Sequence, residues 1–170
     1  MKKIRAVATD PQREAYYLVE QEIHPRQRHC RDLTRSQVQT VISDVRKLYG
    51  LPRISFKREV WPSKFAAWFE PRYSRTGRLI GGTIVFNQDG EQRFTLQTLL
   101  HELAHAIVDT KMDAVQHHGP EFIAVVTWLF DHFMVCPQDA FGAILRRYKV
   151  RSAGYIAGAP KALKFATRTR

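Results

Sequence analysis

The stretch TLLHELAHAIV, residues 98–108, contains two histidines four positions apart, and a glutamate directly follows the first. Apolar residues surround this His101-Glu102-x-x-His105 pattern on almost every side, which predicts a buried helix over residues 94–110. Four residues advance a helix by about 400°, so both imidazoles share one face, about 6 Å apart along the axis. They can therefore reach one metal ion, with Glu102 beside it. The pattern predicts a zinc site in which Glu102 accepts the proton of a metal-activated water.

A third metal ligand must come from outside this helix, because catalytic zinc takes three protein ligands and keeps one open position. His117, His118 and Glu121 are the candidates, 12 to 16 residues after His105. Residue type alone leaves all three open. Gly119-Pro120 is typical of a helix start, so we expect a helix from residue 119 to about 134. Glu121 is then also explained as an acid at the positive end of that helix.

Two helices are expected near the start of the chain. Asp10-Pro11 has the residue types of a helix start, and helical apolar spacing continues until Pro25. Thr34 opens a second helix, and Gln37 three residues later completes a capping box. Gly50 is a typical residue for the end of this helix.

Residues 51–87 have short alternating apolar runs, which predict three antiparallel strands. We expect the last strand, near residues 79–87, to be an edge strand that pairs with an extended substrate. A further helix is expected from residue 137 to 148. The pattern therefore predicts an α+β fold in which a small antiparallel sheet packs on the HExxH helix.

The composition indicates one globular domain: of 170 residues, 44% are hydrophobic and 25% charged. We expect residues 1–150 to form the domain and residues 151–170 to be a flexible basic tail. Cys30 and Cys136 are 106 positions apart without a neighbouring cysteine, which predicts free thiols in a reducing compartment. Neither a run of 18 apolar residues nor a signal core is visible, so a cytoplasmic, non-secreted protein without a membrane partner is expected.

The charge is strongly basic, since 27 Lys and Arg against 16 Asp and Glu give +11. Such an excess favours an anionic partner such as nucleic acid. Aromatic and cationic residues that interleave can stack on unpaired bases beside phosphate contacts, which favours single-stranded or frayed DNA. Core tryptophans with solvated arginines, and a merely solubilising tail, remain the alternatives. The candidate contacts are Trp61, Lys64, Trp68, Arg72, Arg75 and Arg78, with Arg151, Lys161 and Lys164 in the tail.

The segment TLLHELAHAIVDTKMDAVQHHGPEF, residues 98–122, closely resembles the SprT-like family of zinc metalloproteases. That family includes the Spartan-type proteases of DNA–protein crosslink repair, and its motif is HExxH, a loop, and then H-G-x-x-F. The segment GGTIVFN, residues 81–87, also resembles the family's strand before the active-site helix. The resemblance implies a zincin-like domain and one Zn²⁺ per chain. It implies His101, His105 and His118 as zinc ligands and Glu102 as the catalytic residue.

The implied activity is that of a zinc metalloendopeptidase, a hydrolase that acts on proteins associated with or crosslinked to DNA. One alternative is a DNA-binding accessory protein whose zinc site is structural and closed by a fourth ligand. Another is a metal hydrolase acting on a non-peptide bond. SprT-like proteins often carry a zinc ribbon of cysteine pairs, which the two cysteines of this chain do not form.

Overall fold

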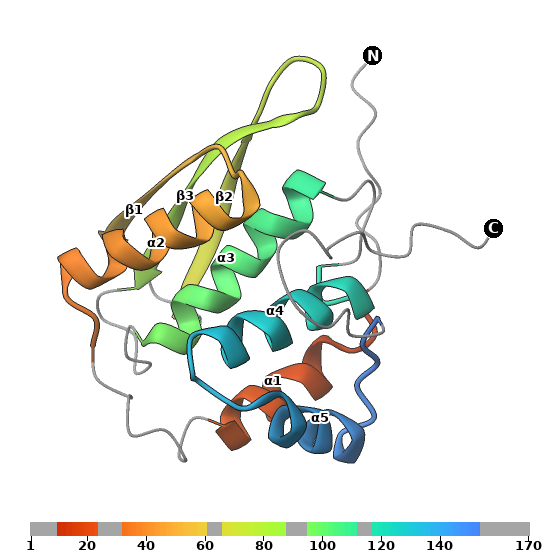
Figure 1. Ribbon diagram of the computed structural model, residues 1–170. Helices are drawn as coiled ribbons and strands as arrows, with labels where there is room; N and C mark the ends of the chain where they lie inside the picture. The colour runs from red at the N-terminus through yellow and green to blue at the C-terminus, as the bar shows by residue number, and fades with distance from the viewer. Residues whose placement is uncertain (1–9, 24–31, 61–65, 88–94, 112–116, 154–170) are drawn as a thin grey trace.

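The structure is a computed structural model that describes residues 10–23, 32–60, 66–87, 95–111 and 117–153. These residues form five helices and a three-stranded sheet, which confirms the α+β prediction. The elements in chain order are α1 (Arg13–Ile23), α2 (Arg35–Tyr49), β1 (Arg53–Glu59), β2 (Ala67–Tyr73), β3 (Leu79–Asn87), α3 (Leu96–Lys111), α4 (Pro120–His132) and α5 (Gln138–Arg147). Helix α3 lies between the sheet and α4, while α1 and α5 lie side by side at the opposite end (Figure 1).

Local sequence signals define the helix ends as expected. The Thr34 side chain accepts a hydrogen bond from the Gln37 N–H, and the Gln37 side chain accepts one from the Thr34 N–H, which completes the capping box. Gly50 follows α2 with φ +59°, a left-handed conformation that glycine adopts most readily. Gly119 caps α4, and Pro120 occupies its first position. The helix predictions are therefore confirmed, with boundaries shifted by a few residues.

The sheet differs from the prediction in two respects. Its strand order is β1-β3-β2, with β1 parallel and β2 antiparallel to β3. A wholly antiparallel sheet was therefore wrong, and so was the edge position for residues 79–87, because β3 is the central strand. Apolar alternation shows which face of a strand is buried but not its neighbour or direction. The turn in which the Gly77 N–H donates to the Ser74 carbonyl fixes only the β2–β3 hairpin.

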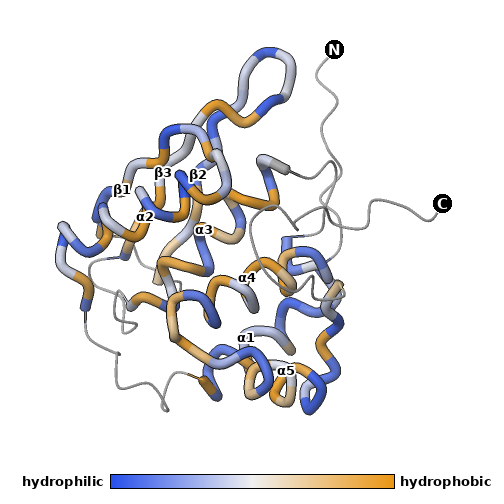
Figure 2. Tube along the Cα trace, viewed as in Figure 1, coloured by the Kyte–Doolittle hydropathy of each residue, from blue (hydrophilic) through white to orange (hydrophobic). Residues whose placement is uncertain are grey.

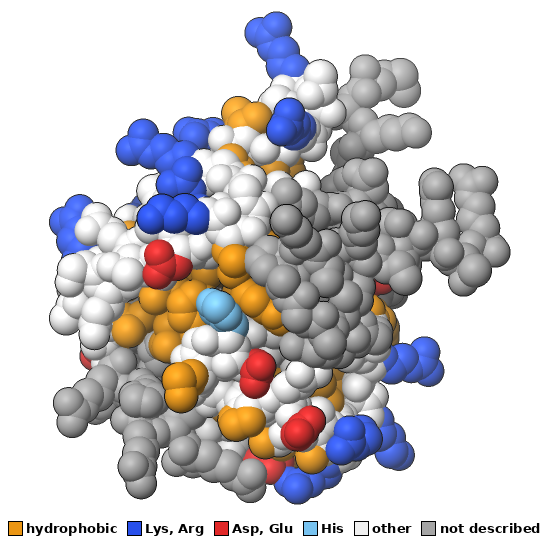
Figure 3. All heavy atoms as spheres, in the orientation of Figure 1, with side chains coloured by type: hydrophobic (Ala, Val, Ile, Leu, Met, Phe, Trp, Pro, Cys, Tyr) orange, Lys and Arg blue, Asp and Glu red, His pale blue; other side chains and the backbone are white. Residues whose placement is uncertain are grey.

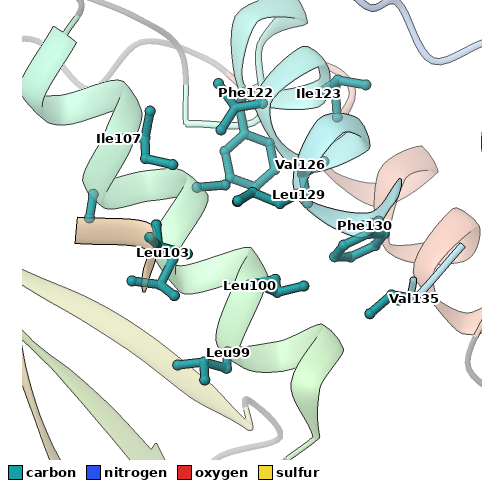
Figure 4. Close-up of a cluster of buried hydrophobic side chains, with 14 of the residues drawn as sticks. Leu99, Leu100, Leu103, Ile107, Phe122, Ile123, Val126, Leu129, Phe130 and Val135 are labelled. Carbon is teal, nitrogen blue, oxygen red and sulfur yellow. The ribbon is translucent and has the colours of Figure 1, made fainter. Parts of the chain in front are cut away.

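The hydrophobic core lies on both sides of α3. Figure 4 shows Leu100 and Ile107 of α3 pointing toward α4, which contributes Phe122 and Val126 to the same cluster. The tube of α4 is largely hydrophobic in Figure 2, as expected for a helix packed on several sides. Each fully buried leucine or phenylalanine contributes about 1.5–3 kcal/mol relative to an exposed one. The helix with the two histidines is thus held by apolar contacts on either side.

A small residue in β3 allows a side chain of β2 to pack closely over it. A Cβ atom added to Gly82 would lie 2.4 Å from the ring of Phe69 on β2 and 2.9 Å from the Glu70 carbonyl oxygen. The missing side chain therefore leaves room for the Phe69 ring. Cys136 is buried, whereas Cys30 lies outside the described residues. No helix in the described ranges is long and apolar enough to cross a membrane.

Candidate metal centre

Three imidazoles from two neighbouring segments converge on one point. Helix α3 presents His101 and His105 on one face, and His118 lies in the turn before α4. The Nε2 atom of His101 is 3.2 Å from that of His105 and 3.4 Å from that of His118. The ligand atoms of all three histidines lie within 4.8 Å of one another. The group is largely buried, with His101 and His118 buried and His105 half-buried.

These separations can be compared with the geometry of a zinc site. Zinc binds imidazole nitrogens at about 2.0–2.1 Å, so two ligands of a tetrahedral ion lie about 3.3–3.4 Å apart. The two Nε2 separations of 3.2 and 3.4 Å agree with this value. Neutral nitrogen ligands also suit zinc and related divalent ions better than calcium or magnesium, which prefer oxygen. The histidine group therefore fits a zinc-type metal ion.

The two other candidates for the third ligand lie outside this group. His117 is exposed, and its ring centroid is 5.9 Å from that of His105. Glu121 lies in the first turn of α4, where an acid interacts favourably with the positive end of the helix. Among the residues that the structure describes, the metal-binding group consists of His101, His105 and His118.

Glu102 is buried on α3 next to His101, on the side that faces β2. Its carboxylate accepts a hydrogen bond from the backbone N–H of Phe69 in β2. Burial raises the pKa of Glu102 to about 7, although the charge of His101 and the Phe69 N–H act in the opposite direction. A bound divalent cation would offset part of this rise, because a nearby positive charge favours the ionised form. The carboxyl group is thus suited to gain and lose a proton near neutral pH.

Sequence reasoning missed two carboxylates that contact the histidines from the beginning of the chain. Glu20 Oε1 on α1 lies 2.8 Å from His101 Nδ1, and Asp10 Oδ2 lies 2.5 Å from His118 Nδ1. Burial lowers the pKa of His101, but the charge and hydrogen bond of Glu20 outweigh burial and raise it to about 9. The sequence predicts Asp10 only as part of a helix start, whereas α1 begins at Arg13. Nothing in the local sequence indicates pairs that are 81 and 108 positions apart.

The remaining ligand environment is aromatic. The ring of Phe122, the last residue of the HGxxF pattern, lies 4.5 Å from His105, 4.9 Å from His118 and 5.1 Å from His101 by ring centroids. Tyr17 on α1 stacks on the His101 ring, with the two ring centroids 6.2 Å apart. Burial and the charge of His101 lower the pKa values of His105 and His118. These two imidazoles are therefore neutral, which is the form that binds a metal.

The candidate nucleic-acid residues fall into separate parts of the chain. The β2–β3 hairpin brings together Trp68, Arg72, Arg75 and Arg78; the three arginines are exposed and Trp68 is half-buried. Arg151 is exposed but lies away from the hairpin, with its backbone N–H bonded to Gln12 on the α1 side. Trp61, Lys64, Lys161 and Lys164 lie outside the described residues.

The outer face of the sheet contains a hollow of about 350 Å³. Arg53 and Arg72 line it together with the hydroxyl groups of Ser55 and Thr83. Its acidic member, Glu70, is partly neutralised because its carboxylate lies 3.3 Å from the Lys57 ammonium group. In Figure 3, Lys and Arg side chains lie over the upper part of the molecule, which contains the sheet, and also at the lower right near α5.

Comparison with known proteins gives one match. Residues 79–139, from β3 to the start of α5, match the model of the SprT-like family. No curated protein and no solved structure matches the chain. The match confirms the resemblance inferred from the two histidine motifs, whereas the zincin-like fold and the boundary between residues 150 and 151 stay predictions. Helix α1, which contacts two of the three ligands, precedes the matched segment.

Proposed function

We propose that this protein is a zinc-dependent metalloendopeptidase, because its residues 79–139 match the SprT-like family. One observation carries the proposal: His101 Nε2 lies at zinc-ligand separations from the Nε2 atoms of His105 and His118, and Glu102, which follows it on α3, is buried. Structural zinc takes four protein ligands, whereas catalytic zinc takes three and keeps one open position. Three histidines form the group among the described residues, which favours an enzyme over an accessory protein with closed zinc.

The proposed chemistry divides between the metal and Glu102. Zinc held by His101, His105 and His118 would supply a Lewis acid that polarises a peptide carbonyl and lowers the pKa of a bound water to near neutral. Glu102 accepts the proton of the attacking water and delivers it to the amide nitrogen as the C–N bond breaks. The backbone N–H of Phe69 holds the Glu102 carboxylate beside β2. The products are a carboxylate and a free amine.

Strand β2 is the best place for an extended protein substrate. In the described sheet β2 is paired only with β3, and its Phe69 N–H donates to the Glu102 carboxylate on α3. An extended peptide can add to such an edge through main-chain hydrogen bonds, and it would then pass close to Glu102. The substrate would be recognised mainly through its backbone, so the enzyme would favour unfolded or extended segments.

We further propose that the protein acts on DNA-associated or DNA-crosslinked proteins. The net charge of +11 and the exposed arginines of the β2–β3 hairpin support contacts with phosphates. The hollow between Arg53 and Arg72 adds hydroxyl donors at the same surface. Because β2 belongs to this hairpin, DNA on the outer face would hold an attached protein near the edge strand.

The test compares wild-type protein with Glu102→Gln and with Glu121→Gln as a matched carboxylate control. Zinc content is measured by elemental analysis, and cleavage of unfolded casein is followed with and without single-stranded DNA. We expect one zinc per chain in all three proteins, and cleavage at least about a hundredfold slower in Glu102→Gln alone. Wild-type protein that binds zinc but cleaves no protein substrate would contradict the peptidase. Cleavage that DNA does not change would contradict only the link to DNA.

A further inference from the structure

We propose that helix α1 and the residues just before it are a functional part of the metal centre, in which Glu20 and Asp10 are positioning residues for His101 and His118. The inference rests on the proposed zinc site, but it concerns residues outside the segment that matches the family. The HExxH and HGxxF motifs supply the ligand atoms. Glu20 on α1 and Asp10 just before this helix fix the ring orientations of two of the three imidazoles.

The hydrogen-bond geometry gives each of these two histidines a defined arrangement. Their Nε2 atoms are 3.4 Å apart and point to the common centre, while the Nδ1 atoms point to the two carboxylates. An ionised carboxylate only accepts hydrogen bonds, so Nδ1 carries the hydrogen in both rings. In a neutral imidazole the lone pair then lies on Nε2, where a metal can use it. Each carboxylate therefore selects the tautomer that binds metal through Nε2.

Glu20 is itself held in place by its surroundings. Its side chain is 15% exposed, and its Oε1 atom also accepts a hydrogen bond of 2.8 Å from the Tyr16 hydroxyl. The Glu20 backbone carbonyl accepts a further bond from Gln97 Nε2 on α3. A carboxylate removed from water needs such partners to remain charged. The arrangement leaves Glu20 little freedom, so the imidazole plane of His101 is set by α1.

Residues just before α1 hold both the side chain and the backbone of His118. Asp10 contacts the ring, and Gln12 Nε2 donates a 2.7 Å hydrogen bond to the His118 carbonyl. The second carboxylate oxygen of Asp10, Oδ1, is buried and has no hydrogen-bond partner among the described residues. An unsatisfied buried oxygen costs folding free energy, so stability alone does not explain an aspartate here. A role toward His118 does explain it.

The remaining ligand, His105, is held by a different kind of contact. His105 packs against the ring of Phe122, which lies within the matched segment. Loss of the Glu20 or the Asp10 carboxylate should therefore weaken the metal site without removing any ligand. Partners of this kind in other metal sites typically change metal affinity by about 10- to 100-fold.

The experiment measures the zinc dissociation constant by competition with a chelator at about pH 9.5, where protons compete least with the metal for the imidazoles. The variants are Glu20→Ala and Asp10→Ala, the milder Glu20→Gln and Asp10→Asn, and Glu14→Ala as a control. Glu14 is exposed on the same helix, so its replacement removes the same charge without touching a histidine. The thermal midpoint of each metal-free variant reports folding, and the visible absorption of bound Co²⁺ reports the ligand geometry.

We expect Glu20→Ala and Asp10→Ala to bind zinc about 10- to 100-fold more weakly and to have altered Co²⁺ spectra. The amide variants keep an accepting oxygen but lose its charge, so their affinities should fall about three- to tenfold. The control should match the wild type.

Three outcomes separate the possibilities. Wild-type protein that binds no zinc would overturn the proposed function together with this inference. Wild-type affinity and spectra in folded Glu20 and Asp10 variants would overturn the inference and leave the zinc site standing. If the alanine variants do not fold, the folded amide variants decide by the same criterion.

Discussion

The ring of Phe122 packs against the imidazole of His105 with the two centroids 4.5 Å apart. Phe122 is fully buried in the first turns of α4, and the same ring also borders His101 and His118. The apolar position of the HGxxF pattern thus has a physical explanation: one phenylalanine supports all three imidazoles. It also links the hydrophobic core between α3 and α4 to the metal centre.

Replacement of Phe122 by alanine should therefore affect stability and metal binding together. The loss of a buried phenylalanine costs about 3–5 kcal/mol of unfolding free energy. We expect weaker zinc binding as well, because His105 loses the ring that it packs against. The control is Phe130→Ala, which opens a comparable space against Phe141 at the other end of α4. That variant should lose stability but keep its zinc affinity once folded, and equal zinc affinity in both folded variants would refute the support role.

Removal of each histidine tests the ligand set directly. His101→Ala, His105→Ala and His118→Ala should each reduce bound zinc well below one per chain, because two remaining nitrogens do not hold zinc tightly. His117→Ala is the matched control, since His117 is the exposed neighbour of His118. Elemental analysis after dialysis provides the measurement. Zinc retained by His118→Ala but lost by His117→Ala would reverse the assignment of the third ligand.

Zinc affinity should depend on pH because His101 must lose a proton to bind the metal. Burial lowers its pKa, but Glu20 outweighs this effect and raises it to about 9 in the metal-free protein. Between pH 7 and 9 the folded protein therefore carries this proton, and each pH unit upward should strengthen zinc binding by about tenfold. The increase should level off above pH 9. Glu20→Gln removes the raising charge, so its affinity should vary less over this range.

The same shift makes a prediction for the metal-free fold. A folded-state pKa above the ordinary value of 6.5 stabilises the protein fully below about pH 6.5. That contribution should disappear as the pH rises through about 9. Urea unfolding of metal-free wild-type protein and Glu20→Gln at pH 6 and pH 10 measures it. The stability difference between the two proteins should be larger at pH 6, and a difference independent of pH would contradict the His101–Glu20 pair.

The glycine under Phe69 offers a test of how the sheet holds the site. Gly82→Ala places a Cβ atom 2.4 Å from the Phe69 ring and 2.9 Å from the Glu70 carbonyl oxygen, and should cost about 1–3 kcal/mol of stability. Gly142→Ala in α5 is the control, because its Cβ would meet only Arg146 Nη1 at 3.5 Å. That change should be neutral or stabilise α5 by up to about 1 kcal/mol. Chemical unfolding compares the two variants. Equal free energies of unfolding would show that β2 shifts to accommodate the added methyl group.

The exposed arginines of the hairpin should contribute to DNA binding through phosphates. Arg72→Gln, Arg75→Gln and Arg78→Gln should each lower the slope of log affinity against log salt by about 0.7 on single-stranded DNA, if each arginine neutralises one phosphate. Arg146→Gln on α5 is the charge-matched control. Fluorescence anisotropy at several salt concentrations measures the slope. Hairpin variants that behave like the control would place the DNA contact elsewhere.

The sequence by itself determined the features that depend on local geometry. The spacing of His101 and His105 places both rings on one helix face whatever surrounds the helix, because 3.6 residues make a turn. Thr34, Gln37 and Gly50 set the ends of α2 through hydrogen bonds and a glycine conformation within a few residues. The resemblance to the SprT-like family also depended on a contiguous stretch, and the family match confirmed it.

Only the tertiary structure decided which distant segments meet. Residue types left His117, His118 and Glu121 equivalent as third ligands, and the entry of the chain into α4 placed His118 beside His101. The sequence likewise did not predict the parallel pairing of β1 with β3, because the alternation of apolar residues indicates which face is buried but not the strand direction. Glu20 reaches His101 across 81 positions. Such a contact depends on how α1 packs against the whole core, and no local pattern of side chains encodes that packing.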